Sequence, residues 1–216
     1  EKSKLAEELI DVIGHAMGRL RGGMGLAIVI VGVLMGASSG VVGATVVTVG
    51  LLSLQPLINR GYNKGVACGV ICASGTLGQI IPPSLVLILL ADILGESVGT
   101  LFAAAMVPGL ILAGMLALYL VLLGIFKPDM VPAIPKEERD ALRTQQLLIK
   151  ICKVVLPPLA LVFAVLGSIV GGIAAPTEAA SMGALGALIL ALVAGRLSLS
   201  VMRDVLHDTL VTSAMV

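Results

Sequence analysis

Long apolar segments, separated by short polar or glycine-rich interruptions, run through nearly the whole chain. Several of them exceed the roughly 18 residues that a helix needs to cross a bilayer. The clearest interruption is Ala-Ser-Gly-Thr-Leu-Gly-Gln-Ile-Ile-Pro-Pro-Ser at 73–84, between apolar residues on both sides. A helix broken at mid-membrane depth leaves backbone N–H and C=O groups without helical partners, which hydrocarbon does not tolerate. The pattern therefore predicts a broken transmembrane helix, with its unwound part covered by protein, water or ions.

Two further segments read as helical hairpins. Residues 24–37 are apolar but too short to cross, and the tip Ser38-Ser39-Gly40 separates them from a second apolar arm that ends near residue 58. A second pair of arms flanks the small-residue tip 172–181. Short apolar arms around a polar tip predict re-entrant hairpins, which enter and leave the membrane on the same side.

The same pattern divides the whole chain. The apolar residues of 3–20 recur at helical spacing among charged ones, which predicts an amphipathic helix lying in the membrane interface. The predicted units are residues 1–22 as that interfacial arm, 23–97 as the first hairpin plus the broken helix, 98–126 as a transmembrane span, 127–153 as a cytoplasmic loop with a second amphipathic arm, and 154–216 as the second hairpin with the start of a further helix.

Composition supports an all-α polytopic membrane protein. The chain is 58% hydrophobic and only 12% charged, whereas soluble domains average about 25% charged. The net charge of +1 gives no reason to expect a nucleic-acid partner. No nucleophile–base pair or metal-ligand cluster is evident, so an enzyme is not expected. Cys68 and Cys72 lie four residues apart without a further ligand nearby, and we expect both to be small buried packing residues.

The few charges predict a topology. Arg60 and Lys64 form a basic turn, and the loop at 127–150 is rich in Lys and Arg, so both are expected to be cytoplasmic. Asp92 and Glu96 then lie in an outside turn. The two hairpins look related, which favours repeats that meet around a mid-membrane site. Counting crossings places both hairpins on the cytoplasmic side, whereas inverted repeats need opposite sides, and the sequence leaves the side of the second hairpin open.

Several motifs together resemble a known family. They occur in this order: Leu5-Ala6-Glu7-Glu8-Leu9, Gly18-Arg19-Leu20-Arg21-Gly22-Gly23, Ser39-Gly40, Ser74-Gly75-Thr76-Leu77-Gly78, Ile81-Pro82-Pro83-Ser84 and Pro176-Thr177-Glu178-Ala179-Ala180. Their order and spacing resemble the large membrane subunit (M subunit, DctM-like) of TRAP (tripartite ATP-independent periplasmic) transporters. The family's subunit is about twice this length. The chain begins without Met and ends in an apolar run, so we expect it to be an internal piece.

The resemblance implies an inverted-repeat, elevator-type importer of small organic acids in the inner membrane of a bacterium or archaeon, driven by sodium. It implies a small membrane (Q-type) subunit, a periplasmic substrate-binding protein, Na⁺ as coupling ion and no other cofactor. It does not name the substrate, because selectivity in this family rests largely with the binding protein. The alternative is a channel or structural scaffold without ion coupling, in which the glycines serve helix packing alone.

Hydroxyl and carbonyl oxygens at the two interruptions give the candidate sites. The predicted sodium ligands are Ser38, Ser39, Gly40, Ser74, Gly75, Thr76 and Gly78. The predicted substrate residues are Ser39, Pro176, Thr177 and Glu178, where a helix N-terminus offers amides to a carboxylate.

Plainer interpretations stand beside these predictions. The segment 74–78 could be a packing kink, and 38–40 an ordinary hairpin turn. Thr177 could be a helix N-cap, with Glu178 as a first-turn acid that suits the helix dipole. If the tip faces the substrate, Glu178 is expected to turn aside, where it bonds backbone amides or helps to form a second sodium site.

Overall fold

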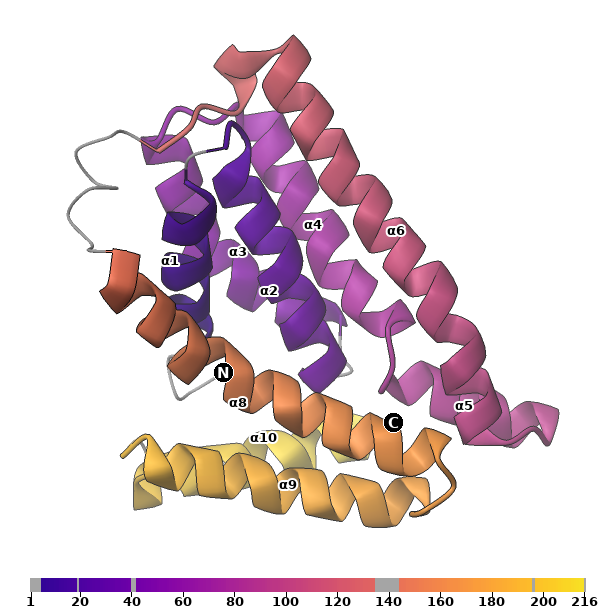
Figure 1. The fold of residues 1–216 in the computed structure, drawn as a ribbon. Helices are drawn as coiled ribbons and strands as arrows, with labels where there is room; N and C mark the ends of the chain where they lie inside the picture. The colour runs from indigo at the N-terminus through magenta and orange to yellow at the C-terminus, as the bar shows by residue number, and fades with distance from the viewer. Residues whose placement is uncertain (1–4, 19, 40–41, 135–143, 196, 216) are drawn as a thin grey trace.

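The computed structural model describes residues 5–18, 20–39, 42–134, 144–195 and 197–215. Within these ranges the chain is helical, with one short 3₁₀ turn and no strand, so the expected all-α fold is confirmed (Figure 1). The elements are α1 (Leu5–Met17), α2 (Gly23–Ser39), α3 (Val42–Asn59), α4 (Lys64–Ile80), α5 (Leu85–Leu94), α6 (Val98–Phe126), η1 (Pro128–Met130), α8 (Thr144–Val170), α9 (Pro176–Val193) and α10 (Leu199–Met215).

Among the described residues, four stretches are long and apolar enough to cross a membrane: Val42–Asn59, Lys64–Leu94, Val98–Phe126 and Pro176–Val193. The apolar helices Gly23–Gly36 and Val154–Val170 are shorter. The chain is therefore a multi-pass membrane protein, and α6 covers the same residues as the predicted span 98–126. The hairpins appear as the pairs α2–α3 and α8–α9, while their re-entry into one side of the membrane stays a prediction.

Helix α2 is the centre of the first bundle, where it packs against α1, α3 and α4. Its residues from Gly23 to Val29 are all buried, and Ala27 and Ile28 are fully covered. Helix α1 turns Leu9 and Ile13 into the same core, as its amphipathic pattern predicts. This bundle holds α2 and α4 firmly together at the level of the polar interruption.

Small residues bring α2 and α4 into backbone contact. A Cβ added to Gly32 would lie 2.7 Å from Ser74 Cβ, and one added to Gly36 would collide with the backbone of Gly78. Small residues four apart on two facing helices are the usual means of close packing in lipid. The partners differ by 42 positions in both pairs (32 with 74, 36 with 78), so the two helices run in the same direction in a fixed register.

The turns at one end of the bundle are tied to each other. The Asn63 N–H donates to the Met130 carbonyl at 3.0 Å, and the Gly22 N–H donates to the Val131 carbonyl at 3.0 Å. This end therefore joins the basic turn at 60–64 to the segment that opens the loop at 127–150. The acidic turn between α5 and α6 lies at the other end of α6 (Figure 1). The arrangement agrees with the sidedness expected from the charges.

Tyr62 supports the same end of the bundle. Its side chain is 4% exposed, and its hydroxyl accepts the backbone N–H of Gly25 at 3.4 Å. Burial raises the pKa of Tyr62 above its ordinary value of 10.0, because the charged phenolate would lose hydration.

The second hairpin departs from the predicted boundary at 153/154. Helix α8 runs unbroken from Thr144 to Val170, so the second amphipathic arm and the first arm of the hairpin are one helix. It continues through Pro157 and Pro158, each of which removes one helical N–H donor without ending the helix. Helices α8 and α9 lie side by side, with α10 behind them (Figure 1).

Candidate functional site

The helix break lies in the last third of the predicted interruption 73–84. Helix α4 stays regular through Ser74, Gly75 and Thr76 and ends at Ile80. The non-helical link is Ile81–Ser84, and α5 begins at Leu85. Only the last four residues of the predicted interruption leave the helix, because close packing against α2 and α3 holds the small residues at 74–78 in α4.

Two prolines explain where α4 ends. In an α-helix the carbonyl of residue i accepts the N–H of residue i+4. The Ile81 N–H still donates to the Leu77 carbonyl at 3.1 Å. Pro82 and Pro83 have no N–H, so the carbonyls of Gly78 and Gln79 lack a helical donor. The end of α4 thus presents unpaired helical carbonyls together with the negative end of the helix dipole, and both suit a cation.

The link also opens a helix N-terminus. Ile88 supplies the first N–H that bonds within α5, to the Ser84 carbonyl at 3.2 Å. The N–H groups of the residues before it have no acceptor inside the helix. Only four link residues separate the C-terminus of α4, with its free carbonyls, from the N-terminus of α5, with its free N–H groups. The break therefore offers a partial negative and a partial positive charge close together.

The predicted sodium residues of α4 divide into two groups. Ser74 is fully buried and its hydroxyl donates to the Ile71 carbonyl at 3.1 Å, while a Cβ at Gly75 would meet Val46 of α3. Thr76 is exposed and donates to the Ala73 carbonyl at 2.9 Å. These three positions serve packing or bond within their own helix. Gly78 alone combines the contact with α2 and a carbonyl without a helical donor.

The first hairpin tip lies at the level of the break. Helix α2 ends at Ser39, three residues after the Gly36–Gly78 contact. Because facing residues of α2 and α4 differ by 42 positions, the backbone of Ser39 lies level with residue 81, the first residue of the link. Gly40 lies outside the described residues, as do the side chains of Ser38 and Ser39.

The second tip is a helix N-terminus. Ala175 is the N-cap of α9, Pro176 occupies the first helical position, and Thr177 and Glu178 follow. The Ala175 N–H donates to Glu178 Oε2 at 3.0 Å. The expectation that Glu178 turns aside to bond a backbone amide is confirmed, whereas an N-cap role for Thr177 is wrong because Ala175 holds that position. Thr177 is exposed.

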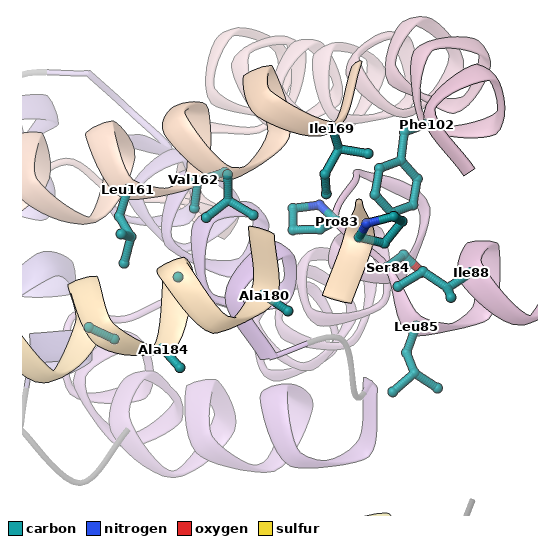
Figure 2. A pocket seen from close by; sticks show the side chains of 14 residues that line it. Pro83, Ser84, Leu85, Ile88, Phe102, Leu161, Val162, Ile169, Ala180 and Ala184 are labelled. Atoms are coloured by element: carbon teal, nitrogen blue, oxygen red, sulfur yellow. The ribbon is translucent and has the colours of Figure 1, made fainter. Parts of the chain in front are cut away.

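A cavity joins the break to the second hairpin (Figure 2). Its volume is about 440 Å³. Pro83, Ser84 and the start of α5 form one wall, α8 and α9 form the other, and Phe102 of α6 closes one side. Pro176 reaches the cavity from the second tip. The second tip therefore shares a cavity with the break, while α2 contributes no described residue to its lining.

Ser84 is the polar feature of this cavity that the sequence predictions did not assign. It is the N-cap of α5, yet its side chain makes no capping hydrogen bond. Its hydroxyl is buried without a partner, and the side chain is 0% exposed. Its place in the Ile-Pro-Pro-Ser motif indicates a helix N-cap. The lack of a hydrogen-bond partner depends on how other helices pack around the residue, so the sequence alone does not show it.

The expected burial of Cys68 and Cys72 is wrong. Both are exposed on α4. The buried face of α4 carries Val66, Val70 and Ser74 toward α2 and α3, and the two cysteines project from another face of the helix.

The membrane-length helices, the broken helix and the paired hairpins define a polytopic α-helical membrane protein. The family model for the tripartite ATP-independent periplasmic transporter DctM component matches residues 1–216. The chain belongs to this family, as its motifs predict, and it is a protein of the inner membrane.

Curated relatives agree with this family. The C4-dicarboxylate TRAP transporter large permease protein DctM of Pseudomonas aeruginosa is 36% identical over 189 residues, covering 87% of this chain and 42% of the relative. The DctM protein of Vibrio cholerae is 35% identical over 191 residues, covering 87% and 40%. The ectoine large permease TeaC of Halomonas elongata is 31% identical over 199 residues, covering 90% and 44%. The chain thus spans less than half the length of these relatives.

Proposed function

We propose that this chain forms part of the large permease subunit of a sodium-coupled importer of small organic acids. The importer works with a small membrane subunit and with a periplasmic substrate-binding protein. The binding protein delivers the substrate to the permease. Family membership supports this role, and the broken helix gives it a physical mechanism. The observation that carries the proposal is the pair of carbonyls at Gly78 and Gln79, which Pro82 and Pro83 deprive of helical donors at the level of the first hairpin tip.

Sodium is the cation that this arrangement suits. Hard cations prefer oxygen ligands, and unwound backbone supplies them inside a membrane protein without a charged side chain. We propose that Na⁺ binds between Ser39 at the end of α2, the Gly78 carbonyl and the link that follows Ile80. Ser38 and Gly40 of the same tip belong to this candidate site. Ser74 and Gly75 shape it from the preceding turn of α4, where they pack against α2 and α3. Thr76 stands beside them on the exposed face of α4.

The substrate side of the proposal uses the two helix N-termini. Organic acids are anions, and the amides at the start of α5 and α9 carry partial positive charge. Pro176 lines the cavity, and Thr177 follows it in the first turn of α9. The carboxylate of Glu178 is engaged by the Ala175 N–H, so its charge is held by its own helix rather than offered to a bound anion. Binding of both ions at neighbouring helix ends would couple sodium to the substrate.

The test is the sodium dependence of uptake by the full-length permease with its partner proteins in liposomes. Ser39→Ala should raise the sodium concentration for half-maximal uptake by about tenfold, since it removes one oxygen ligand worth about 1.4 kcal/mol. Ser53→Ala is the matched control, because Ser53 is a buried serine of the same hairpin whose hydroxyl donates to the Val49 carbonyl. Unchanged sodium activation in Ser39→Ala, or an equal change in the control, would contradict the proposed ion site.

A further inference from the structure

We propose that three helical connections bend at their prolines, so that the second hairpin pivots against the first bundle. The bending points are Pro82-Pro83 between α4 and α5, Pro108 in α6, and Pro157-Pro158 in α8. This movement is separate from the proposed transport function, because it does not depend on which ion or substrate is bound.

The described residues form two separate hydrophobic cores. The first core lies in the bundle of α1–α4, and Ile28 and Val70 are among its buried members. The buried residues of the second core are Phe102, Leu166, Ile169 and Ala179. Within the described residues the chain passes from one core to the other three times, through the α4–α5 link, through α6 and through α8. Movement of one core against the other must therefore be absorbed in these three segments.

Helix α6 changes core at Pro108. Phe102 and Met106 pack in the second core, whereas Leu116 packs against the first. Pro108 lies between them and has no N–H, so the carbonyl of Ala104 lacks its helical donor. A proline inside a helix is a usual place for a kink. The weakest point of α6 therefore coincides with its passage between the cores.

Helix α8 shows the same arrangement. Val155 packs against the first core, and Leu166 is buried in the second. Pro157 and Pro158 lie between these two residues and remove two consecutive helical hydrogen bonds. The N-terminal part of α8 thus belongs to the first bundle, which it meets through α1, while the C-terminal part pairs with α9.

The third crossing is the link between α4 and α5. Helix α4 lies in the first core, and Leu87 of α5 packs against the second, with Pro82-Pro83 between them. A Cβ added to Gly109, the residue after Pro108, would lie 2.8 Å from Ile81 Cγ1 at the start of the link. Two of the three bending points are therefore neighbours in space, as a shared pivot requires.

Distances between spin labels test the pivot. The labels are placed on the full-length permease with its small subunit, after replacement of the native cysteines. The sites are Leu51 on α3, Ile125 at the C-terminal end of α6 and Leu185 on α9, and all three are exposed. Pulsed electron paramagnetic resonance then gives a distance distribution for each pair of labels.

Bending and sliding predict opposite results. Bending keeps the C-terminal part of α6 with the first bundle, so the Leu51–Ile125 distribution should be narrow and the Ile125–Leu185 distribution broad. If the first bundle instead slides past α6, α8 and α9 as one rigid body, Leu51–Ile125 is broad and Ile125–Leu185 is narrow. That result, or narrow distributions for both pairs, would overturn the pivot.

Proline variants tie the motion to the bending points. Pro108→Ala, Pro157→Ala and Pro158→Ala, combined in one protein, return the missing N–H donors to α6 and α8. The Ile125–Leu185 distribution should then lose its broad component, and uptake should become slower. Alanine is a better helix former than proline, so the variant is expected to fold, which its melting midpoint verifies.

Pro56→Ala is the matched control. Pro56 also lies inside a helix, but Leu54 and Leu57 on its two sides both pack in the first core, so a bend there moves neither core against the other. Pro82-Pro83 is kept in every variant, because it shapes the candidate ion site. An equal narrowing in Pro56→Ala, or a combined variant that keeps the broad distribution or the parent's uptake rate, would refute the pivot.

The sodium dependence separates this inference from the proposed function. The combined variant leaves the candidate ion site intact, so its sodium concentration for half-maximal uptake should equal that of the parent. Uptake by the parent that ignores sodium would contradict the proposed function, while the label distances would still decide the pivot. Sodium-driven uptake with narrow distributions for both label pairs would overturn the pivot and leave the proposed function standing.

Discussion

The crossing of α2 and α4 makes Gly78→Ala an informative change. The added Cβ would collide with the Cα of Gly36 and lie 2.6 Å from its carbonyl carbon, whereas ordinary contact begins at 3.4 Å. The two backbones must therefore separate by at least the difference, about 0.8 Å, or α4 must bend. Overpacking of this kind costs about 1–3 kcal/mol. About 2–4 °C of melting temperature corresponds to each kcal/mol in a chain of 150–250 residues, and about half of that in a permease twice as long, so the midpoint should fall by about 1–6 °C.

Gly69→Ala is the control on the same helix, because a Cβ there would meet nothing within 4 Å. Alanine favours a helix over glycine by about 1 kcal/mol, so this variant should be as stable as the parent or slightly more stable. The assay is the fraction of full-length permease that stays monodisperse after heating, read by size-exclusion chromatography with and without sodium. Gly78→Ala should also lose stabilisation by sodium, because the end of α2 moves away from the break. If both variants behave alike, the close crossing of α2 and α4 is wrong.

Three further predictions test other parts of the account. With native cysteines replaced, a cysteine at Glu96 should be labelled from outside by an impermeant thiol reagent and one at Glu138 should not; the reverse pattern would refute the topology. Glu178→Gln should leave the substrate affinity nearly unchanged, because the carboxylate is bound to its own helix N-cap rather than offered to a bound anion; a clear change in substrate affinity would contradict this. Tyr62→Phe should cost about 0.5–1.5 kcal/mol by removing the acceptor of the Gly25 N–H. The folded pKa of Tyr62 is raised, so its contribution is full below pH 10.0 and is lost as the pH rises through the folded pKa. Denaturation midpoints that match the parent at pH 7 would contradict the Tyr62 prediction.

The sequence was sufficient for the helical class and for the existence of a broken helix. Apolar length and the polar interruption are local properties, and the pair Pro82-Pro83 marks a point where a helix loses two donors. The extent of the break within the interruption was not predicted, because Ser74, Gly75 and Gly78 have two physical uses. Small residues accompany unwinding, and they also allow close helix packing. The small residues Gly32 and Gly36 on the facing helix show that close packing, rather than unwinding, is the use made of them here. One sequence does not show which helices face each other.

The candidate site was predicted in part for the same reason. The turn of Glu178 toward a backbone amide follows from its place three residues after an N-cap, which is a local relation. The cavity depends on residues of α8 and α9 that lie about 75 to 100 positions after Ser84, so no local pattern announces it. The continuity of α8 across the predicted boundary at 153/154 was missed because the sequence changes there from charged to apolar, and such a change does not require a helix to end.

The most direct test of sodium coupling is uptake by the reconstituted full-length transporter, with its small subunit and binding protein, under an imposed sodium gradient. Radiolabelled substrate accumulation is compared between an inward sodium gradient and an equal potassium gradient at the same membrane potential. The account predicts accumulation above the outside concentration with sodium and none with potassium. Equal uptake in the two gradients, ending at equilibrium with the outside concentration, would contradict it and favour a channel without ion coupling.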